Sequence, residues 1–511
     1  MDKNELRSEK LLKNATWATV GYLAYAIAGF VSRSVFIYKL GNELTGVSTL
    51  FNSILNLLSM AELGISGAIS IHLYKPVADG DERKIAGLLN LYRKAYRVIS
   101  LVVLGLGLSM LPFIEIFVKT DAKIPHLKWY FFLYVLRTVF SYCYAYKGTL
   151  ISVYQEEYRK TNISNALLII STILQTVTLY FTSSYTLYIL IYVTSTLLTN
   201  VLISREADKC YPYLNQYKEE TVSPEEKRSI FSYIKADSIN KAASSIKTAT
   251  DSMIISTFVN VVVTGIVGNY NMVVNTVNTV LGFFFTSSIP SVGNMMATTD
   301  KRAQYNTFLD LEFIAFWIYG FLGVGMLCTL TPFVRDVWIR QDNLILGQFT
   351  LFLLVLNFFI TGTSIPVNVF FTAKGLIQKI PYLNIVNVLI NLVLSLWLVQ
   401  TYDVDGVYIG TVISFILSSL PLMAYMVLRH HFDGNYIPYV KLYGYYFLVV
   451  FLSGTACVAV CNLITPTGLV GIACRVLACT LVFNGIFLLA SFWTREFRSI
   501  LSLVRNIVKK R

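Results

Sequence analysis

Apolar segments long enough to cross a membrane follow one another along almost the whole chain. Each holds about 20 or more residues, which as a helix spans a hydrocarbon core roughly 30 Å thick. The composition agrees, because 55% of the residues are hydrophobic and 14% are charged, whereas about 25% are charged in soluble domains. We therefore expect an all-α integral membrane protein with about 14 transmembrane helices. The predicted spans cover residues 14–38, 43–72, 97–118, 127–153, 161–182, 185–204, 238–259, 262–290, 305–333, 346–372, 380–400, 405–428, 442–464 and 468–493.

The distribution of lysine and arginine predicts how these spans are oriented. Cytoplasmic connections of membrane proteins are enriched in both residues, and here they gather at alternate connections. With the N-terminus inside, few basic residues fall in the outer turns: Lys39, Lys119, Lys123, Lys128, Arg335 and Arg340. We therefore expect both termini in the cytoplasm. The net charge of +13 follows from this bias and favours contact with anionic membrane lipids, whereas the sequence offers no basic soluble domain that would bind nucleic acid.

A stretch near the start of the chain recurs about two hundred residues later. A duplicated membrane half of this kind is typical of secondary transporters. Because the separation covers six spans, the two halves should enter the membrane in the same direction and form two six-helix lobes in a parallel pseudo-two-fold repeat. We predict an N-terminal lobe at 1–204, a C-terminal lobe at 238–428, and two extra spans with a basic cytoplasmic tail at 429–511. The matches at one constant separation pair Thr45 with Thr264, Gly46 with Gly265, Asn52 with Asn271, Asn56 with Asn275, Asp81 with Asp300 and Arg83 with Arg302.

Two polar segments should lie on the cytoplasmic side. Residues 205–237 link the predicted lobes, and Ser223 followed by Pro224 and Glu226 has the pattern of a helix start, so a helix should run from here toward span seven. Residues 79–97 carry apolar side chains along one helical face. This segment predicts either an amphipathic helix at the membrane surface or a span that extends into the cytosol.

The seven cysteines give no recognisable pattern. Most of them lie within predicted spans, and Cys210 lies in a cytoplasmic connection. Their spacing is typical of neither a disulfide framework nor a metal site. We therefore expect no cofactor and no metal centre.

Several short blocks resemble one family of exporters. In the first half these are Arg33–Gly41, Leu44–Ser48, Ser59–Ala68, Leu73–Ala78 and Tyr92–Tyr96. Thr250–Ser256 and Gly268–Asn271 resemble the start of that family's second lobe. The family is the polysaccharide-transporter (Wzx-like) branch of the multidrug/oligosaccharidyl-lipid/polysaccharide exporter superfamily.

The resemblance implies a function. It implies a flippase that moves a polyprenyl-diphosphate-linked oligosaccharide from the cytoplasmic to the outer leaflet of a bacterial plasma membrane, with glycan polymerase or assembly proteins as partners. Such a protein is not an enzyme. A cation-coupled multidrug exporter of the same superfamily is the alternative, since fold alone does not fix the substrate. A membrane polymerase or glycosyltransferase fits less well, because it ordinarily needs a substantial polar loop with catalytic residues, and the outer loops here are short.

Charged residues inside the spans are the candidate site residues. Each costs roughly 2.5–3.5 kcal/mol at a helix centre, so such charges normally face a polar cavity or a partner. Arg33, Arg137 and Lys247 would form a cationic cavity for a diphosphate, and Glu62 and Asp251 would supply a gate. At the repeat separation Arg33 and Asp251 occupy nearly equivalent depths, which predicts a charge pair between them. Structural ion pairs, such as Lys247 with Asp251 one helical turn apart, remain the alternative.

Aromatic residues add a candidate sugar-binding surface on span four. Tyr130, Tyr134, Arg137, Ser141 and Tyr144 should share one helical stripe. A guanidinium flanked by tyrosines suits sugar stacking and hydrogen bonds to phosphate. Among these tyrosines we assign Tyr134 and Tyr144 to the substrate. The chain has 33 tyrosines, however, and tyrosines at membrane interfaces need no ligand.

Overall fold

The computed structural model consists of helices joined by turns, with no strand among the residues it describes. It describes the backbone of residues 3–62, 65–121, 123–286, 288–374, 376, 383–432, 434 and 436–509. Side chains are described from residue 21 onward, apart from those gaps and residues 61, 66, 233, 235–245, 247–248, 283, 286, 290–291, 297, 383–384, 503–504 and 506–509. The chain is thus an all-α membrane protein, as the apolar runs predict.

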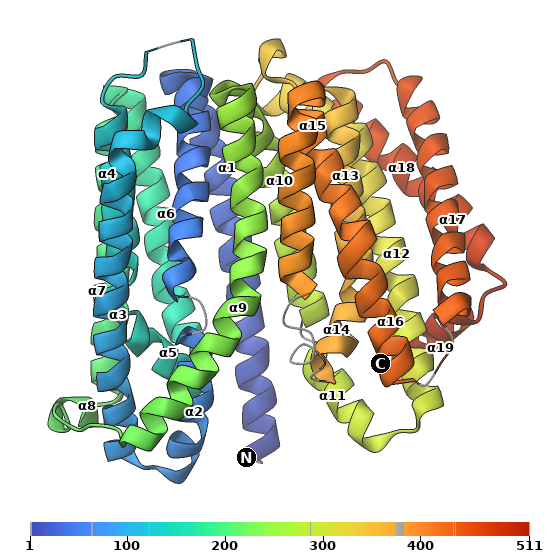
Figure 1. The fold of residues 1–511 in the computed structure, drawn as a ribbon. Helices are drawn as coiled ribbons and strands as arrows, with labels where there is room; N and C mark the ends of the chain where they lie inside the picture. The colour runs from blue at the N-terminus through green and yellow to red at the C-terminus, as the bar shows by residue number, and fades with distance from the viewer. Residues whose placement is uncertain are drawn as a thin grey trace. The chain divides into compact units, whose positions relative to one another are not determined.

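The chain forms two compact units, Met1–Gly265 and Ile266–Arg511, whose helices are labelled in Figure 1. The first unit contains α1 (Lys3–Leu58), α2 (Ile65–Asp79), α3 (Glu82–Met110), α4 (Leu127–Ser141), α5 (Ala145–Val153), α6 (Glu157–Thr182), α7 (Tyr185–Cys210), α8 (Tyr213–Gln216), α9 (Pro224–Ile254) and the start of α10 (Val261–Thr286). The second contains the rest of α10, α11 (Ile289–Thr298), α12 (Lys301–Pro332), α13 (Gln348–Thr363), α14 (Ile365–Ala373), α15 (Leu383–Ser414), α16 (Leu420–His430), α17 (Tyr436–Asn462), α18 (Gly468–Ser491) and α19 (Arg495–Lys509).

Each predicted span coincides with helical chain. Nine helical segments among the described residues are long and apolar enough to cross a membrane. Two of them, Gly21–Leu58 and Ile385–His430, each include parts of two predicted spans, because the chain turns at Gly41 and at Asp403 without a long loop. Predicted spans four, seven and eight correspond to α4 with α5, to α9, and to α10 with α11. The boundary between the compact units lies later than the predicted start of the second lobe, because α9 packs along α1 and α2; the lobe boundaries themselves stay a prediction.

Side chains cap the starts of several helices. The Asp81 carboxylate accepts a hydrogen bond from the backbone nitrogen of Lys84 at 3.0 Å and so caps α3. Asp300, its partner in the repeat, caps α12 through the backbone nitrogen of Ala303 at 3.1 Å. Ser223 caps α9 with Pro224 in the first turn, which confirms the helix predicted from the linker toward span seven. The repeated aspartates therefore serve the same structural purpose in both halves.

The segment after Asp81 is a membrane helix that extends beyond the apolar run. α3 continues without interruption from Glu82 to Met110. The apolar face predicted for this segment is buried, including Ile85, Leu89 and Tyr92. It packs with α2, α5 and the α8–α9 connection in one hydrophobic cluster. One continuous helix favours the extended span over a separate amphipathic helix.

Several spans are broken, and two of the breaks fall at equivalent places in the repeat. Span four is interrupted between α4 and α5, where Tyr144 adopts a left-handed conformation with φ 63°. Span ten is interrupted between α13 and α14 at Ser364. The two breaks lie almost one repeat separation apart. Broken spans expose backbone groups inside the membrane region, which is tolerated where protein or a cavity surrounds them.

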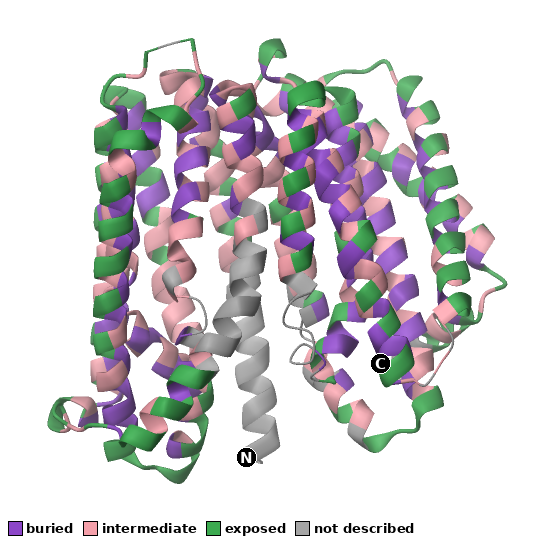
Figure 2. Cartoon of the chain, viewed as in Figure 1, coloured by how far each residue is buried: buried purple, intermediate pink, exposed green. Residues whose placement is uncertain are grey.

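Many large apolar side chains are exposed, and exposed residues recur along many of the helices (Figure 2). Along α18, for example, Leu469, Leu477, Leu481 and Leu489 are each more than half exposed. A soluble protein rarely exposes a patch of this size. This surface is the lipid-facing side expected of membrane helices.

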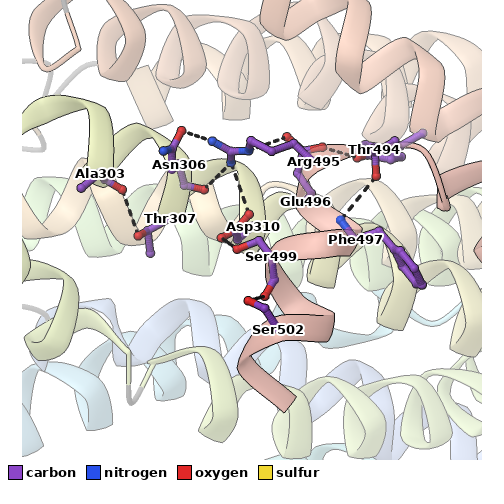
Figure 3. Close-up of polar contacts among 11 residues, drawn as sticks. Ala303, Asn306, Thr307, Asp310, Thr494, Arg495, Glu496, Phe497, Ser499 and Ser502 are labelled. Atoms are coloured by element: carbon purple, nitrogen blue, oxygen red, sulfur yellow. Dashed lines mark hydrogen bonds and ion pairs between the residues drawn. The ribbon is translucent and has the colours of Figure 1, made fainter. Parts of the chain in front are cut away.

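The C-terminal helix is held to the second unit by a polar cluster (Figure 3). The guanidinium Nη2 of Arg495 lies 3.3 Å from the Asp310 carboxylate on α12, and it also donates to the backbone oxygen of Asn306 at 3.0 Å. The Ser499 hydroxyl donates to the other Asp310 oxygen at 2.7 Å. These contacts fix the start of α19 to the beginning of α12.

Candidate functional site

Arg137 lies at the centre of a polar and aromatic cluster in the first unit. Its guanidinium carbon is 3.7 Å from the ring centroid of Tyr192 on α7, close enough for a strong cation–π contact. Its Nη1 donates to the Asn52 side-chain oxygen on α1 at 3.2 Å. Its Nε is buried with no hydrogen-bond partner among the described atoms. The group is therefore positioned by three helices, with donor capacity left over for an anion.

Tyr134 connects this cluster to the same three helices. The side chain is 1% exposed, and its hydroxyl donates to the Ser48 hydroxyl on α1 at 3.0 Å. The Tyr185 hydroxyl on α7 in turn donates to Tyr134 at 3.3 Å. Phe51 packs against the Tyr134 ring with centroids 5.5 Å apart. Tyr134 is thus a buried member of a hydroxyl network and holds the helices around Arg137 together.

Arg33 lies in the same cluster. It is half-buried on α1, and its Nη2 donates to the Thr49 hydroxyl at 3.5 Å. Its electrostatic neighbours include Tyr134, Tyr185 and Tyr188, so the tyrosines that surround Arg33 overlap with those near Arg137. The structure therefore brings together three of the predicted residues, namely Arg33, Tyr134 and Arg137.

Tyr144 lies elsewhere. α4 ends at Ser141 and the chain turns before α5, so the predicted stripe stops at Ser141 and its extension to Tyr144 is wrong. The Tyr144 ring is 44% exposed and lines a separate pocket of about 250 Å³ with Arg93, Lys147 and Asp208. A left-handed residue at a helix break changes the direction of every later side chain, which helical spacing cannot anticipate.

The predicted gate residues come from two different elements of the first unit. Glu62 lies in the short turn Ser59–Glu62 after α1, where it accepts a hydrogen bond from the Tyr96 hydroxyl of α3 at 2.9 Å. Asp251 lies half-buried in the last turn of α9. The side chain of Lys247 lies outside the described residues. The roles assigned to Lys247, Glu62 and Asp251 stay predictions.

The sequence analysis did not predict two sets of candidate functional residues. Tyr185, Tyr188 and Tyr192 complete the cluster around the arginines, and only their spacing along one face of span six could have pointed to them. Glu312 is a buried carboxyl on α12, 2% exposed, that accepts a hydrogen bond from the Tyr439 hydroxyl at 3.1 Å. Its other oxygen has no hydrogen-bond partner among the described atoms. An acidic residue within span nine was the available signal.

Comparisons with known proteins place this fold. No profile of a known protein family matches the chain, and no curated protein matches it in sequence. Among solved structures, the lipid II flippase MurJ in an inward closed conformation is similar with a TM-score of 0.65 and 16% identity over 92% of this chain and 99% of that one.

Multidrug transporters are similar as well. An inward-facing MATE family transporter of the MOP superfamily matches with a TM-score of 0.60 and 14% identity over 78% of this chain and 95% of that one. The MATE multidrug transporter DinF-BH matches with a TM-score of 0.59 and 16% identity over 84% and 97% of the two chains. At these identities the likeness establishes the fold, which this multi-pass membrane chain shares with a lipid flippase and with multidrug exporters of the MOP superfamily.

Proposed function

We propose that the protein is a flippase for a polyprenyl-diphosphate-linked oligosaccharide, which it moves from the cytoplasmic to the outer leaflet for the synthesis of a cell-surface polysaccharide. The observation that carries this proposal is that two half-buried guanidinium groups, those of Arg33 and Arg137, belong to one tyrosine-rich cluster of membrane helices. An anionic head group repays the cost of keeping such charges in the membrane.

The chemistry of the cluster matches each part of the proposed head group. Arginine presents a planar fork of donors that binds phosphate oxygens in pairs. The half-buried Tyr188 and Tyr192 rings offer stacking surfaces for sugars, and the hydroxyls of Ser48 and Thr49 offer hydrogen bonds. A multidrug exporter that carries organic cations would be opposed by two fixed positive charges at this place.

The second unit contains an apolar cavity of its own. This cavity, of about 580 Å³, lies between α12, α13 and α17. Gly320, Gly323 and Gly454 form part of its walls, and Phe359 and Phe451 line it. Apolar groups that enter it would be stabilised by about 25 cal/mol per Å² of buried surface.

The test is transport of a fluorescent lipid-linked oligosaccharide by the purified chain in liposomes, together with complementation of a flippase-deficient strain. The wild type should move the lipid-linked oligosaccharide, and Arg33→Ala or Arg137→Ala should lower the rate at least tenfold while membrane abundance stays near normal. The lysine variants should recover only part of the rate, because the paired donors are lost. Arg205→Ala serves as control, since Arg205 is exposed near the end of α7.

The same assay separates the alternative function. Efflux of cationic drugs by the wild type, without movement of the lipid-linked oligosaccharide, would establish a multidrug exporter and overturn the flippase. Full activity of both alanine variants in the lipid assay would be compatible with a flippase, but it would show that Arg33 and Arg137 do not bind its substrate.

A further inference from the structure

Four of the cysteines come together from three helices of the second unit. Cys328 comes from α12, Cys457 and Cys461 from successive turns of one face of α17, and Cys479 from α18. The sulfur atoms of Cys328, Cys461 and Cys479 all lie within 4.8 Å of one another. Those of Cys461 and Cys479 are 3.6 Å apart, and Cys457 is an electrostatic neighbour of Cys479.

These thiols are shielded from the surroundings. Their residues are 9% exposed for Cys328, 4% for Cys461, 1% for Cys479 and 0% for Cys457. Buried cysteines usually behave as small apolar residues and are scattered through a core. Packing alone does not explain why these four cysteines, which are far apart in the sequence, lie close together. Their spacing along the chain did not indicate it.

We propose that Cys328, Cys461 and Cys479, with Cys457 as a further donor, form a binding site for one thiophilic metal ion of filled d shell, Zn²⁺ or Cu⁺. Thiolates are the ligands that select these ions. With a metal–sulfur bond of about 2.3 Å, tetrahedral ligands lie about 3.8 Å apart. The sulfur atoms of Cys461 and Cys479 are 3.6 Å apart, and no two of the three lie more than 4.8 Å apart, so small side-chain rotations suffice to close the site.

An entry route and compensating charges accompany the cluster. A cavity of about 440 Å³ is lined by Cys328 and Cys461 and by Arg335 and Arg475. On binding, metal–sulfur bonds replace S–H bonds and the released protons leave through the water of this cavity. The complex of one cation with three or four thiolates is anionic, so the nearby guanidinium groups lower the cost of holding it in the membrane.

The arginines are themselves held in place beside the site. Nη2 of Arg475 donates to the backbone oxygen of Ile464 at 2.9 Å, and its Nη1 donates to that of Pro466 at 3.3 Å. Nε of Arg335 lies 2.8 Å from the Asp336 carboxylate. Asp336 therefore offsets the charge of Arg335, and Arg475 supplies the remaining positive charge at the cavity.

The experiment uses the full chain, purified in detergent with a phosphine reductant and a chelator. After transfer to Zn²⁺ or to Cu⁺ kept reduced by ascorbate, the bound metal is counted by mass spectrometry and its ligands are identified by X-ray absorption. We expect one ion per chain with three or four sulfur neighbours. Cys328→Ser, Cys461→Ser and Cys479→Ser should each weaken binding at least tenfold, whereas the control Cys474→Ser, at an exposed position of α18, should not.

Protection of thiols in the wild type tests the site without any variant. Bound metal should slow alkylation of these cysteines by a small maleimide at least tenfold and leave Cys474 unaffected. Absence of metal from the reduced wild type would overturn the proposal, as would equal binding by the triple serine variant. A Cys461–Cys479 disulfide that persists in the reductant and excludes metal would also overturn it.

Discussion

Gly46 and Gly265 lie against each other where the second half of α1 crosses the start of α10. A Cβ added to Gly265 would fall 2.9 Å from the backbone nitrogen of Gly46, and one added to Gly46 would overlap the carbonyl oxygen of Val261. Asn42 reinforces the crossing by donating to the backbone oxygen of Val262 at 2.8 Å. Both glycines belong to the sequence repeat, so the repeat preserves a close approach of two backbones that other residues would prevent.

Substitution at this crossing should destabilise the protein. Gly46→Ala should lower the free energy of unfolding by about 1–3 kcal/mol or more, the usual cost of overpacking, because the overlapping atom belongs to the backbone. Gly105→Ala is the matched control, since a Cβ there meets no atom within 4 Å. Thermal unfolding of the purified variants followed by tryptophan fluorescence measures both effects; equal melting temperatures for the two variants would contradict the crossing.

The contact of Arg137 with the Tyr192 ring should matter for transport. Tyr192→Phe keeps the ring face over the guanidinium and should retain most of the rate. Tyr192→Leu removes an interaction worth about 0.5–2 kcal/mol, which should lower the affinity for the lipid-linked oligosaccharide by roughly twofold to thirtyfold. Initial rates over a range of substrate concentrations in liposomes distinguish the two variants. If Tyr192→Phe lowered the affinity more than Tyr192→Leu, the hydroxyl group and not the ring of Tyr192 would be responsible for its effect.

Glu312 should be more sensitive to loss of its acceptor oxygen than to loss of its acidity. Glu312→Gln keeps an oxygen for the Tyr439 hydroxyl and should change thermal stability little. Glu312→Leu leaves that buried hydroxyl without its acceptor, which costs about 1–3 kcal/mol. Melting temperatures test the packing role, and transport by the glutamine variant tests whether the acidic proton takes part. A glutamine variant as unstable as the leucine variant would contradict the hydrogen-bond account.

The orientation predicted from the basic residues can be tested with single cysteines at exposed positions. Asp79→Cys and Glu219→Cys should resist an impermeant maleimide in intact cells and react after permeabilisation. Asp121→Cys and Arg340→Cys should react in intact cells. Labelling of the wild type gives the background from its native thiols. Reaction of the Glu219 variant from outside would invert the topology.

The predicted pair of Arg33 and Asp251 calls for a double-mutant cycle on transport. If the two charges interact, the losses caused by Arg33→Ala and Asp251→Ala should not add, and the charge-swapped variant should regain part of the rate. Abundance of each variant in the membrane is the control. Additive losses with no recovery in the swap would show that the residues act independently.

The sequence predicted the membrane helices well because hydropathy over about 20 residues reflects burial in lipid directly. It also predicted the helix start at Ser223, which depends on local hydrogen bonds. It did not predict the break at Tyr144, because aromatic residues seldom adopt positive φ and nothing in the local pattern announces it.

The candidate site was predicted only in part, for a similar reason. Charge within a span singles out Arg33 and Arg137, and helical spacing adds Tyr134. The residues that position these arginines, such as Asn52 and Tyr192, come from other helices. A single sequence without an alignment does not show which helices are in contact. The convergence of Cys328, Cys461 and Cys479 is hidden for the same reason, since three separate helices supply the thiols.

The continuity of α9 has a mechanical consequence. Its 31 residues run from the linker after α8 into predicted span seven without a break, a length of roughly 46 Å at 1.5 Å per residue. A flexible linker would absorb a displacement of the end at Pro224, whereas a continuous helix transmits that displacement to the turn that carries Asp251. The connection after Ser223 is therefore rigid. Glycine pairs inserted into the exposed first turns of α9 would make it flexible and uncouple the two ends of the helix, without a substitution in the predicted span.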